Sequence, residues 1–313
     1  MIPSTKNISS RRGSYHRDWI ETILIFLLFL CVIPSLVIPS QAYGGRPSER
    51  DVRNFLNSLD KRCVEYGWTD IAPRKIRWEF HRTTGSKNPL IFIQLGNSEK
   101  YCNLFLGGVH GDELPTVYLL LRLAHHLEEN HHLFKDKCIV IAPLVNPDGF
   151  FAKTPKRVNA SGIDINRNFP TKDWNTKALR QWKRKCQANK RYYPGKKPGS
   201  EQETLFQMAL IKRYRPQKIL SIHSPLSFYD FDGPSSDLDT LERWLDRISR
   251  ETNHPFKKFG FFPGSLGNYA GHERNIFTLT LELPSSDPRM GTAFFQKFQP
   301  AFLKFLNLSI PAR

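Results

Sequence analysis

Two histidines and one glutamate are spaced so that they could bind a single metal ion. His110 and Glu113 lie three residues apart in the turn His-Gly-Asp-Glu, which directly follows an apolar run. A hydrogen-bonded surface pair can show the same spacing, so this motif needs a third ligand. His223 ends a second apolar run and is a candidate, although a lone histidine at a strand end often has only a structural role. Together the three side chains make a zinc-ligand set that leaves one coordination position open for water, as hydrolysis requires.

Glu282 is the candidate base that would take a proton from such a water. It ends an apolar segment in which strand alternation places it with Thr278 and Thr280, on the side opposite the larger apolar residues. A carboxylate in such a strand is costly to bury without a partner or a chemical task. A solvated glutamate at the end of a strand is the alternative interpretation.

These side chains can reach one ion only if the strands before them end at the same edge of one sheet. Strands that alternate with helices favour an α/β fold with a mainly parallel sheet covered on both faces. Ser200 and Glu203 form a possible capping box at the start of one of these helices. Open α/β sheets bind ligands at the carboxyl ends of their strands. Apolar runs predict strands at residues 90–95, 102–109, 138–145, 218–223 and 275–283, and helical periodicity predicts helices at 48–66, 115–128, 200–213 and 238–252.

Seven stretches of the chain occur together in one order: 110–113 (HGDE), 146–149 (NPDG), 164–170 (DINRNFP), 193–203 (YPGKKPGSEQE), 223 (H), 263–267 (PGSLG) and 280–284 (TLELP). In these stretches the chain resembles the zinc metallocarboxypeptidase (funnelin) family, and more narrowly the murein peptide amidases and related cell-wall peptidases. The resemblance covers about residues 90–310 and implies an α/β fold with a mixed, mainly parallel central sheet. It also implies that His110, Glu113 and His223 bind one zinc ion per chain, and that Glu282 is the general base and acid.

The same resemblance implies how a substrate would be held. Arg157 would stabilise the oxyanion, and Asn166 and Arg167 would bind the terminal carboxylate of the substrate, since a planar guanidinium can contact both of its oxygens. The segment around Gly267 and Asn268, which corresponds to the floor of the specificity pocket, contains no acidic residue. We therefore do not expect a pocket that selects a basic terminal side chain.

The expected reaction is the hydrolysis of peptidoglycan stem peptides near diaminopimelate. The enzyme would be a γ-D-glutamyl-diaminopimelate amidase or a carboxypeptidase of the D,L or L,D type. The alternatives are a general metallocarboxypeptidase for L-peptides and a deacylase similar to aspartoacylase, which shares a His, Glu, His zinc set. A wall-binding protein without activity is a further alternative, but the three ligand positions and the base position are intact.

The amino-terminal segment, residues 1–42, is typical of an export signal. Basic residues precede eleven apolar residues at 23–33, a run too short for a membrane-spanning helix. Small residues favour cleavage before Tyr43, and an uncleaved signal anchor is the alternative. We therefore expect an exported, periplasmic protein, or one anchored in the inner membrane and facing the periplasm. Residues 43–80 are predicted to form a helical extension packed on a catalytic domain at 81–313.

The chain is strongly basic, with 46 Lys and Arg against 29 Asp and Glu and a formal net charge of +17. Such a field favours anionic partners. Residues 174–200 contain nine of these bases, no acid, and the aromatic residues Trp182, Tyr192 and Tyr193. This mixture could bind nucleic acid, but export removes most access to it, so we expect no nucleic-acid partner. The segment is interpreted as a solvated surface insertion, with an anionic substrate as another possible neighbour.

Four cysteines follow the predicted signal, at Cys63, Cys102, Cys138 and Cys186. In an oxidising compartment they could form up to two disulfides in three connectivities, whereas buried free thiols are the alternative. Cysteines are too few for a disulfide-built scaffold, so the hydrophobic core must supply most of the stability. The sequence does not predict the oligomeric state.

Overall fold

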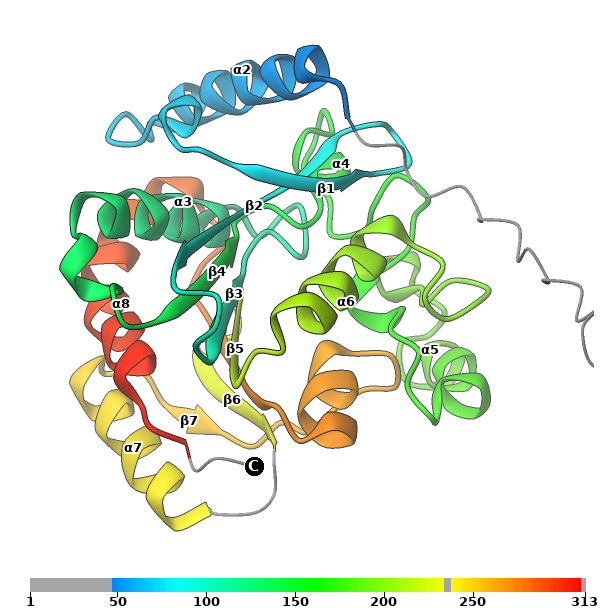
Figure 1. Ribbon diagram of the computed structural model, residues 1–313. Helices are drawn as coiled ribbons and strands as arrows, with labels where there is room; N and C mark the ends of the chain where they lie inside the picture. The colour runs from blue at the N-terminus through cyan, green and yellow to red at the C-terminus, as the bar shows by residue number, and fades with distance from the viewer. Residues whose placement is uncertain (1–46, 234–237, 311–313) are drawn as a thin grey trace, which may run out of the picture. The chain divides into compact units, whose positions relative to one another are not determined.

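Short apolar segments form one sheet of eight strands that runs through the middle of the fold (Figure 1). This computed structural model describes residues 47–233 and 238–310, so the predicted signal at 1–42 lies outside the described residues. The strand order is β1-β2-β4-β3-β5-β8-β6-β7. The strands are β1 (Glu79–Thr83), β2 (Pro89–Gly96), β3 (Cys102–Leu106), β4 (Cys138–Ala142), β5 (Lys218–His223), β6 (Phe228–Gly233), β7 (Phe256–Lys257) and β8 (Phe277–Glu282).

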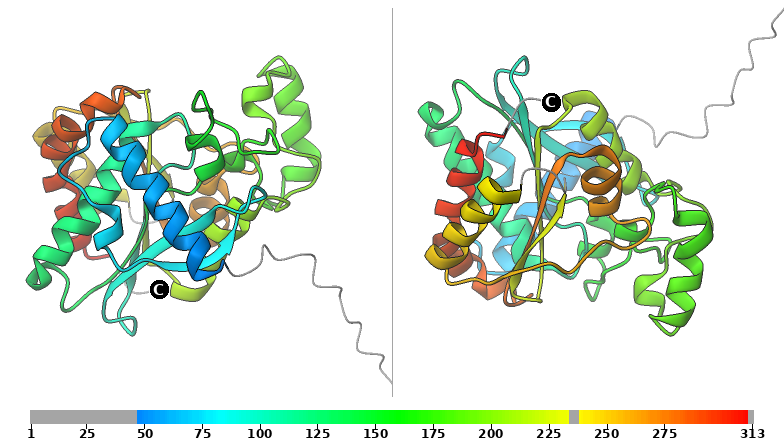
Figure 2. Two further views of the ribbon diagram at one scale, coloured as in Figure 1. Left: turned by 90° about the horizontal axis from the view of Figure 1, so that it is seen from above. Right: turned by 90° about the horizontal axis from the view of Figure 1, so that it is seen from below.

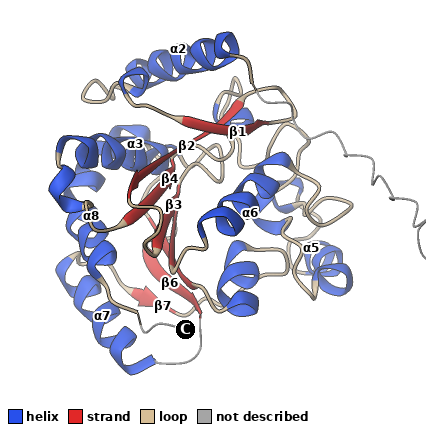
Figure 3. Cartoon of the chain, in the orientation of Figure 1, coloured by secondary structure: helices blue, strands red, loops and turns tan. Residues whose placement is uncertain are grey.

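The four central strands, β4, β3, β5 and β8, run parallel to one another. They are flanked on either side by β2 and β6, which run antiparallel to them. At the outer edges, β1 pairs antiparallel with β2 and β7 pairs parallel with β6. The predicted fold class, α/β with a mixed, mainly parallel central sheet, is confirmed (Figure 3). The carboxyl ends of the four central strands therefore share one edge of the sheet.

Helices cover both faces of this sheet. Successive side chains of each central strand point to opposite faces, and both faces are buried. Ile139 and Ile141 of β4 pack in the cluster that also contains α3, α7 and α8, whereas Val140 packs with α6 on the other face. Figure 2 shows these helices on their two sides of the sheet. The helices are α2 (Glu49–Glu65), α3 (Leu114–Glu129), α4 (Pro147–Phe150), α5 (Leu179–Arg184), α6 (Gln202–Tyr214), α7 (Leu238–Glu251) and α8 (Gly291–Asn307).

The first described helix, α2, begins at a capping box. The Ser48 hydroxyl accepts a hydrogen bond from the Asp51 N–H at 3.2 Å, and the Asp51 carboxylate accepts one from the Ser48 N–H at 3.0 Å. Phe55 and Leu59 lie on the apolar face of α2 and are buried in the same cluster as Tyr118 of α3. Burial of that face holds the helix against the rest of the fold.

The capping box predicted at Ser200 and Glu203 is wrong. Helix α6 begins at Gln202 after Glu201, and no side chain caps its amino terminus. Glu203 is buried instead, where its carboxylate accepts a hydrogen bond from the Asn159 amide at 3.1 Å. Burial raises the pKa of Glu203 to about 7. A side chain that points into the protein cannot also reach back to the start of its own helix.

One disulfide joins Cys102 to Cys138, which face each other directly on β3 and β4. The other two cysteines after residue 42, Cys63 and Cys186, are free thiols, of which Cys63 is buried. Of the two alternatives, disulfides and free thiols, the chain therefore has both: one disulfide and two free thiols among these four cysteines. In the part of the chain that the structure describes, we find no helix with the length and apolar character needed to span a membrane.

Candidate active site

The site lies at the carboxyl edge of the parallel strands, where successive connections pass to opposite faces of the sheet. The connection from β3 to β4 carries α3 on one face, and the connection from β4 to β5 carries α6 on the other. The connections that leave β3 and β4 therefore pass to opposite faces of the sheet, an arrangement that opens a crevice at this edge. His110 follows β3, His223 ends β5, and Glu282 ends β8 in direct register with His223.

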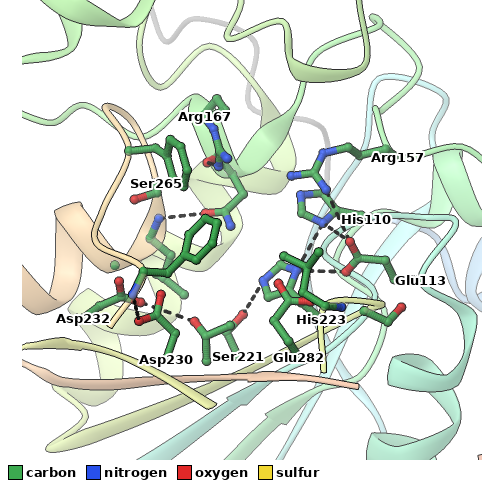
Figure 4. Close-up of a pocket in the computed structure, with 18 of the residues that line it drawn as sticks. His110, Glu113, Arg157, Arg167, Ser221, His223, Asp230, Asp232, Ser265 and Glu282 are labelled. Carbon is green, nitrogen blue, oxygen red and sulfur yellow. Dashed lines mark hydrogen bonds and ion pairs between the residues drawn. The ribbon is translucent and has the colours of Figure 1, made fainter. Parts of the chain in front are cut away.

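Three buried side chains meet in this crevice with their donor atoms facing one another (Figure 4). His110 Nδ1 lies 2.7 Å from Glu113 Oε1 and 3.1 Å from His223 Nδ1. The other carboxylate oxygen, Glu113 Oε2, lies 2.9 Å from His223 Nδ1. Each side chain is no more than 4% exposed. Two imidazole nitrogens and one carboxylate are a donor set that suits zinc, so these residues fit the predicted ion.

The two histidines keep the Glu113 carboxylate negatively charged in this buried site. Burial alone would raise the pKa of Glu113, but His110 and His223 outweigh that effect, and the pKa lies below its usual range. Glu113 is therefore an anion near neutral pH. Metal ligands must be deprotonated to bind, so this carboxylate is already in the form that holds a cation.

Each histidine of the centre has a partner at its other ring nitrogen. His110 Nε2 lies 3.2 Å from Asp164 Oδ1, and His223 Nε2 lies 3.0 Å from Ser221 Oγ. An acceptor at Nε2 keeps a proton there and leaves the Nδ1 lone pair directed at the centre. Sequence reasoning did not single out either partner. Strand alternation could have found Ser221, two residues before His223. Asp164 begins the stretch 164–170 (DINRNFP), but nothing local indicates its contact with His110.

Asp164→Asn is expected to weaken zinc binding by about 10- to 100-fold, because Asp164 orients His110 through Nε2 and also accepts from Arg157 Nε at 2.9 Å. An asparagine amide cannot accept both hydrogen bonds. Competition with a chromophoric chelator measures the affinity, and Asp246→Asn, at an exposed position on α7, is the matched control. Unchanged zinc affinity in Asp164→Asn would show that Asp164 does not position the ligand.

Arg157 lies beside the centre and is held there by two acids. Its Nε donates to Asp164 Oδ2 at 2.9 Å, and a terminal nitrogen donates to Glu113 Oε1 at 3.3 Å. Its guanidinium carbon also lies 5.3 Å from the centroid of the Tyr192 ring. Burial by itself would lower the pKa of Arg157, but Asp164 and Glu113 raise it, so the guanidinium keeps its charge in the buried crevice.

Two of the motif turns pack directly on each other and so place Arg157 near the metal ligands. A Cβ atom on Gly111 would lie 2.2 Å from the carbonyl carbon of Gly149, a contact that only glycine allows. The Asn146 side chain accepts from the Gly149 N–H at 2.9 Å and donates to the Arg157 carbonyl at 3.0 Å. The turn Asn-Pro-Asp-Gly is thus the link between the ligand turn and the arginine.

Glu282 faces the same crevice from the end of β8, beside His223 (Figure 4). Its Oε2 accepts a hydrogen bond from the Leu226 N–H at 3.4 Å. Burial raises the pKa of Glu282 above its usual range, although His223 opposes the shift. A carboxylate with a raised pKa is suited to take up a proton and release it again.

Asn166 and Arg167 lie in the short 3-10 turn Ile165–Arg167, and both line the same cavity. Asn166 Oδ1 accepts from the Leu266 N–H at 2.8 Å, which ties this loop to the segment before Gly267. Arg167 donates to the Asn166 carbonyl at 2.7 Å, and its guanidinium carbon lies 4.2 Å from the centroid of the Phe262 ring. The ring holds the planar group at the wall of the cavity, where it can bind a carboxylate.

One cavity of about 350 Å³ joins these residues. The predicted surface insertion, residues 174–200, contributes Cys186, Arg191 and Tyr192 to its wall, so part of this segment faces the site rather than only solvent. Arg191 also contacts Asp112 of the ligand turn. All seven residues predicted from the sequence line the cavity: His110, Glu113, Arg157, Asn166, Arg167, His223 and Glu282.

The cavity contains acidic residues that the sequence analysis did not anticipate. Asp230 and Asp232 of β6 line the same cavity, beside Thr280 and Gly267. The segment around Gly267 does lack acids, but β6 pairs with β8 and brings its own carboxylates to that place. Sequence reasoning missed them because residues 228–233 were not predicted as a strand.

Comparison with known proteins agrees with this arrangement. The sequence model of the zinc carboxypeptidase family matches residues 83–297. Murein peptide amidase A from Escherichia coli K12 is 31% identical over 206 residues, which cover 64% of this chain and 78% of that protein. The carboxypeptidase N catalytic chain of Rattus norvegicus is 38% identical over 90 residues, which cover 23% of this chain and 19% of that one.

Solved structures show the same fold. The murein-tripeptide amidase from Escherichia coli O157 superposes with a TM-score of 0.54 at 27% identity, covering 75% of this chain and 93% of that one. Bovine thrombin-activatable fibrinolysis inhibitor superposes with a TM-score of 0.62 at 16% identity, covering 85% of this chain and 97% of that one. At that identity the second match supports the fold alone.

Proposed function

The chain belongs to the zinc carboxypeptidase family, and from this premise we propose that it is an exported hydrolase that cleaves peptidoglycan stem peptides next to diaminopimelate. The observation that carries the proposal is the convergence of three metal-binding side chains, Glu282 and two arginines in one cavity. The similarity to murein peptide amidase A supports the substrate. The disulfide between β3 and β4 supports export to the periplasm, because disulfides persist in oxidising compartments.

In the proposed reaction the residues of the chain move one proton and stabilise one charge. A zinc ion held by His110, Glu113 and His223 supplies a Lewis acid that makes water nucleophilic near neutral pH. Glu282 takes the proton of the attacking water and later delivers it to the leaving amine. Arg157 donates to the oxygen of the scissile carbonyl as negative charge develops there.

Binding of the substrate follows from the cations around the cavity. Arg167 and Asn166 hold the carboxylate of the residue that leaves, and Arg157 lies beside the metal-binding side chains. Arg191 adds a further positive charge to the wall. Stem peptides of peptidoglycan contain several carboxylates, so a cationic cavity favours their association.

The function is tested by comparing three substrates of the purified, zinc-loaded protein. These are a tripeptide that ends in γ-D-glutamyl-diaminopimelate, the corresponding tetrapeptide, and a blocked L-dipeptide. We expect the highest kcat/KM for a peptide that contains diaminopimelate, and mass analysis of the products identifies the bond that is cleaved. Digestion of purified wall fragments with and without a chelator shows whether the polymer or its released peptides are attacked.

Each alternative function has its own result in this experiment. Preferred cleavage of the blocked L-dipeptide would indicate a general metallocarboxypeptidase. Release of an acyl group from N-acyl amino acids, with no peptide cleavage, would indicate a deacylase. Binding of wall fragments without zinc-dependent turnover would indicate a wall-binding protein and would reject the proposal.

A further inference from the structure

A basic segment beside the cavity, residues 177–197, carries more positive charge than the reaction described above uses. It contains nine lysines and arginines and no acid, and each of the nine residues is exposed. Two of them form ion pairs, Lys177 with Asp173 and Arg191 with Asp112. In residues 47–233 and 238–310, no carboxylate lies within 4.0 Å of the side-chain nitrogens of the other seven: Arg180, Lys183, Arg184, Lys185, Lys190, Lys196 and Lys197.

Aromatic residues hold the backbone of this basic segment in place. Trp174, in the turn just before it, is buried, and its Nε1 donates to the Arg167 carbonyl at 2.8 Å. Trp182 Nε1 donates to the Asn189 carbonyl at 2.7 Å, and the centroid of its ring lies 4.8 Å from that of Tyr193. The cations therefore project from a backbone that is tied to the cavity wall and closed on itself.

Helix α5, within the basic segment, gains little from burial and carries like charges side by side. None of its residues is buried. Arg180 lies three residues before Lys183 and four before Arg184, spacings at which like charges are neighbours on a helix and destabilise it. In Figures 1 and 2 this part of the chain lies at the edge of the fold, away from the sheet. An anionic partner on this surface would offset the repulsion.

The basic segment also reaches the cavity itself. Arg191 and Tyr192 line the cavity wall, and Arg191 contacts Asp112 of the ligand turn. The guanidinium carbon of Arg157 lies 5.3 Å from the centroid of the Tyr192 ring. The cations thus begin at the wall of the cavity and continue on exposed surface. A polymer with one peptide in the cavity would have this surface beside its flanking parts.

We propose that the basic segment is an exosite for the peptidoglycan polymer, which it binds through the carboxylates of stem peptides that flank the one in the cavity. The inference rests on the proposed function, because it assigns this surface to the polymeric form of the same substrate. A released peptide fills only the cavity, whereas the polymer engages the cavity and the exosite together. Binding at two linked sites raises the effective concentration of the scissile bond, so the polymer is the preferred substrate.

The test removes three neighbouring charges of the exosite at once. Lys183→Gln/Arg184→Gln/Lys185→Gln changes only exposed residues outside the cavity wall. We expect this variant to release peptides from purified, insoluble wall polymer at least about 10-fold more slowly than the wild type, because the cationic surface no longer attracts the polymer. Its kcat/KM for the soluble tripeptide should stay within a few-fold of the wild type. Added salt should slow the wild type on the polymer far more than the variant.

Lys61→Gln/Lys135→Gln/Arg247→Gln is the matched control, since it changes the net charge equally at exposed positions outside the basic segment. It should behave as the wild type on polymer and on tripeptide. Equal rates of all three proteins on the polymer overturn the inference. So do equal losses on polymer and tripeptide in the exosite variant and in Lys196→Gln/Lys197→Gln, which leaves α5 unchanged, because they indicate a structural role.

Binding without turnover separates this inference from the proposed function. If no wall peptide is cleaved, the proposed function fails, and cosedimentation with the insoluble polymer at low salt still decides the inference. The wild type and the control should bind at least about 10-fold more tightly than the exosite variant, and equal binding is the contrary result. Amidation of the polymer carboxylates should abolish this difference. A difference that survives amidation, or tighter binding to phosphatidylglycerol vesicles than to the polymer, overturns the assignment.

Discussion

Glu282→Gln is expected to lose at least about 2 to 4 kcal/mol of transition-state stabilisation, which is a decrease of roughly 30- to 1,000-fold in kcat. Glutamine has nearly the same shape and can still accept the hydrogen bond from the Leu226 N–H. It cannot take a proton from water or return one to the leaving amine. Zinc content should stay at one ion per chain, because Glu282 is not among the three side chains that converge as donors.

The measurement needs kcat and zinc content from the same preparation. Glu99→Gln, at an exposed position, is the matched control and should behave as the wild type. Turnover by Glu282→Gln within a few-fold of the wild type would reject the role of Glu282 as proton carrier. Loss of both zinc and turnover would instead place Glu282 among the groups that maintain the metal site.

The positions of the strand-end residues could be predicted because strand ends are visible in the sequence. Apolar runs that stop at His223 and at Glu282 indicate where two strands end. Parallel pairing then puts both residues at one edge, and the structure pairs them directly. His110 and Glu113 follow a third run that ends at the same edge. Periodicity therefore carried most of the information about these four residues.

The positions of Asp164, Asp230 and Asp232, which lie around the metal-binding side chains or further along the cavity, could not be predicted in the same way. Asp164 lies in a loop and reaches His110 across 54 positions of sequence, so no local pattern marks the contact. Asp230 and Asp232 lie on β6, where acids alternate with aromatic residues, and only the antiparallel pairing with β8 places them beside Gly267. Long-range pairing, rather than residue type, decides which of the many acids of a chain face a site.

Removal of zinc is expected to abolish turnover and to lower the temperature of unfolding. The Nδ1 atoms of His110 and His223 lie 3.1 Å apart, and both contact the Glu113 carboxylate in a buried crevice, so a cation held there would contact all three side chains. Zinc that binds only the folded protein stabilises it by about 4 kcal/mol when its free concentration is 1,000 times Kd. For a protein of this size that corresponds to a rise in Tm of on the order of 10 °C.

The experiment dialyses the protein against a chelator, follows Tm and turnover, and then restores zinc in steps. His223→Ala removes one donor, so its Tm should show little response to zinc, whereas Ser221→Ala keeps all three donors and should respond at higher zinc concentrations. The decisive comparison is between recovered turnover and bound metal. Full activity in protein shown by metal analysis to contain no zinc would contradict the assignment, as would a Tm that zinc leaves unchanged. Parallel recovery of Tm and turnover at one zinc per chain would tie both to the same three side chains, because no other group of three such ligands is found in the described part of the chain.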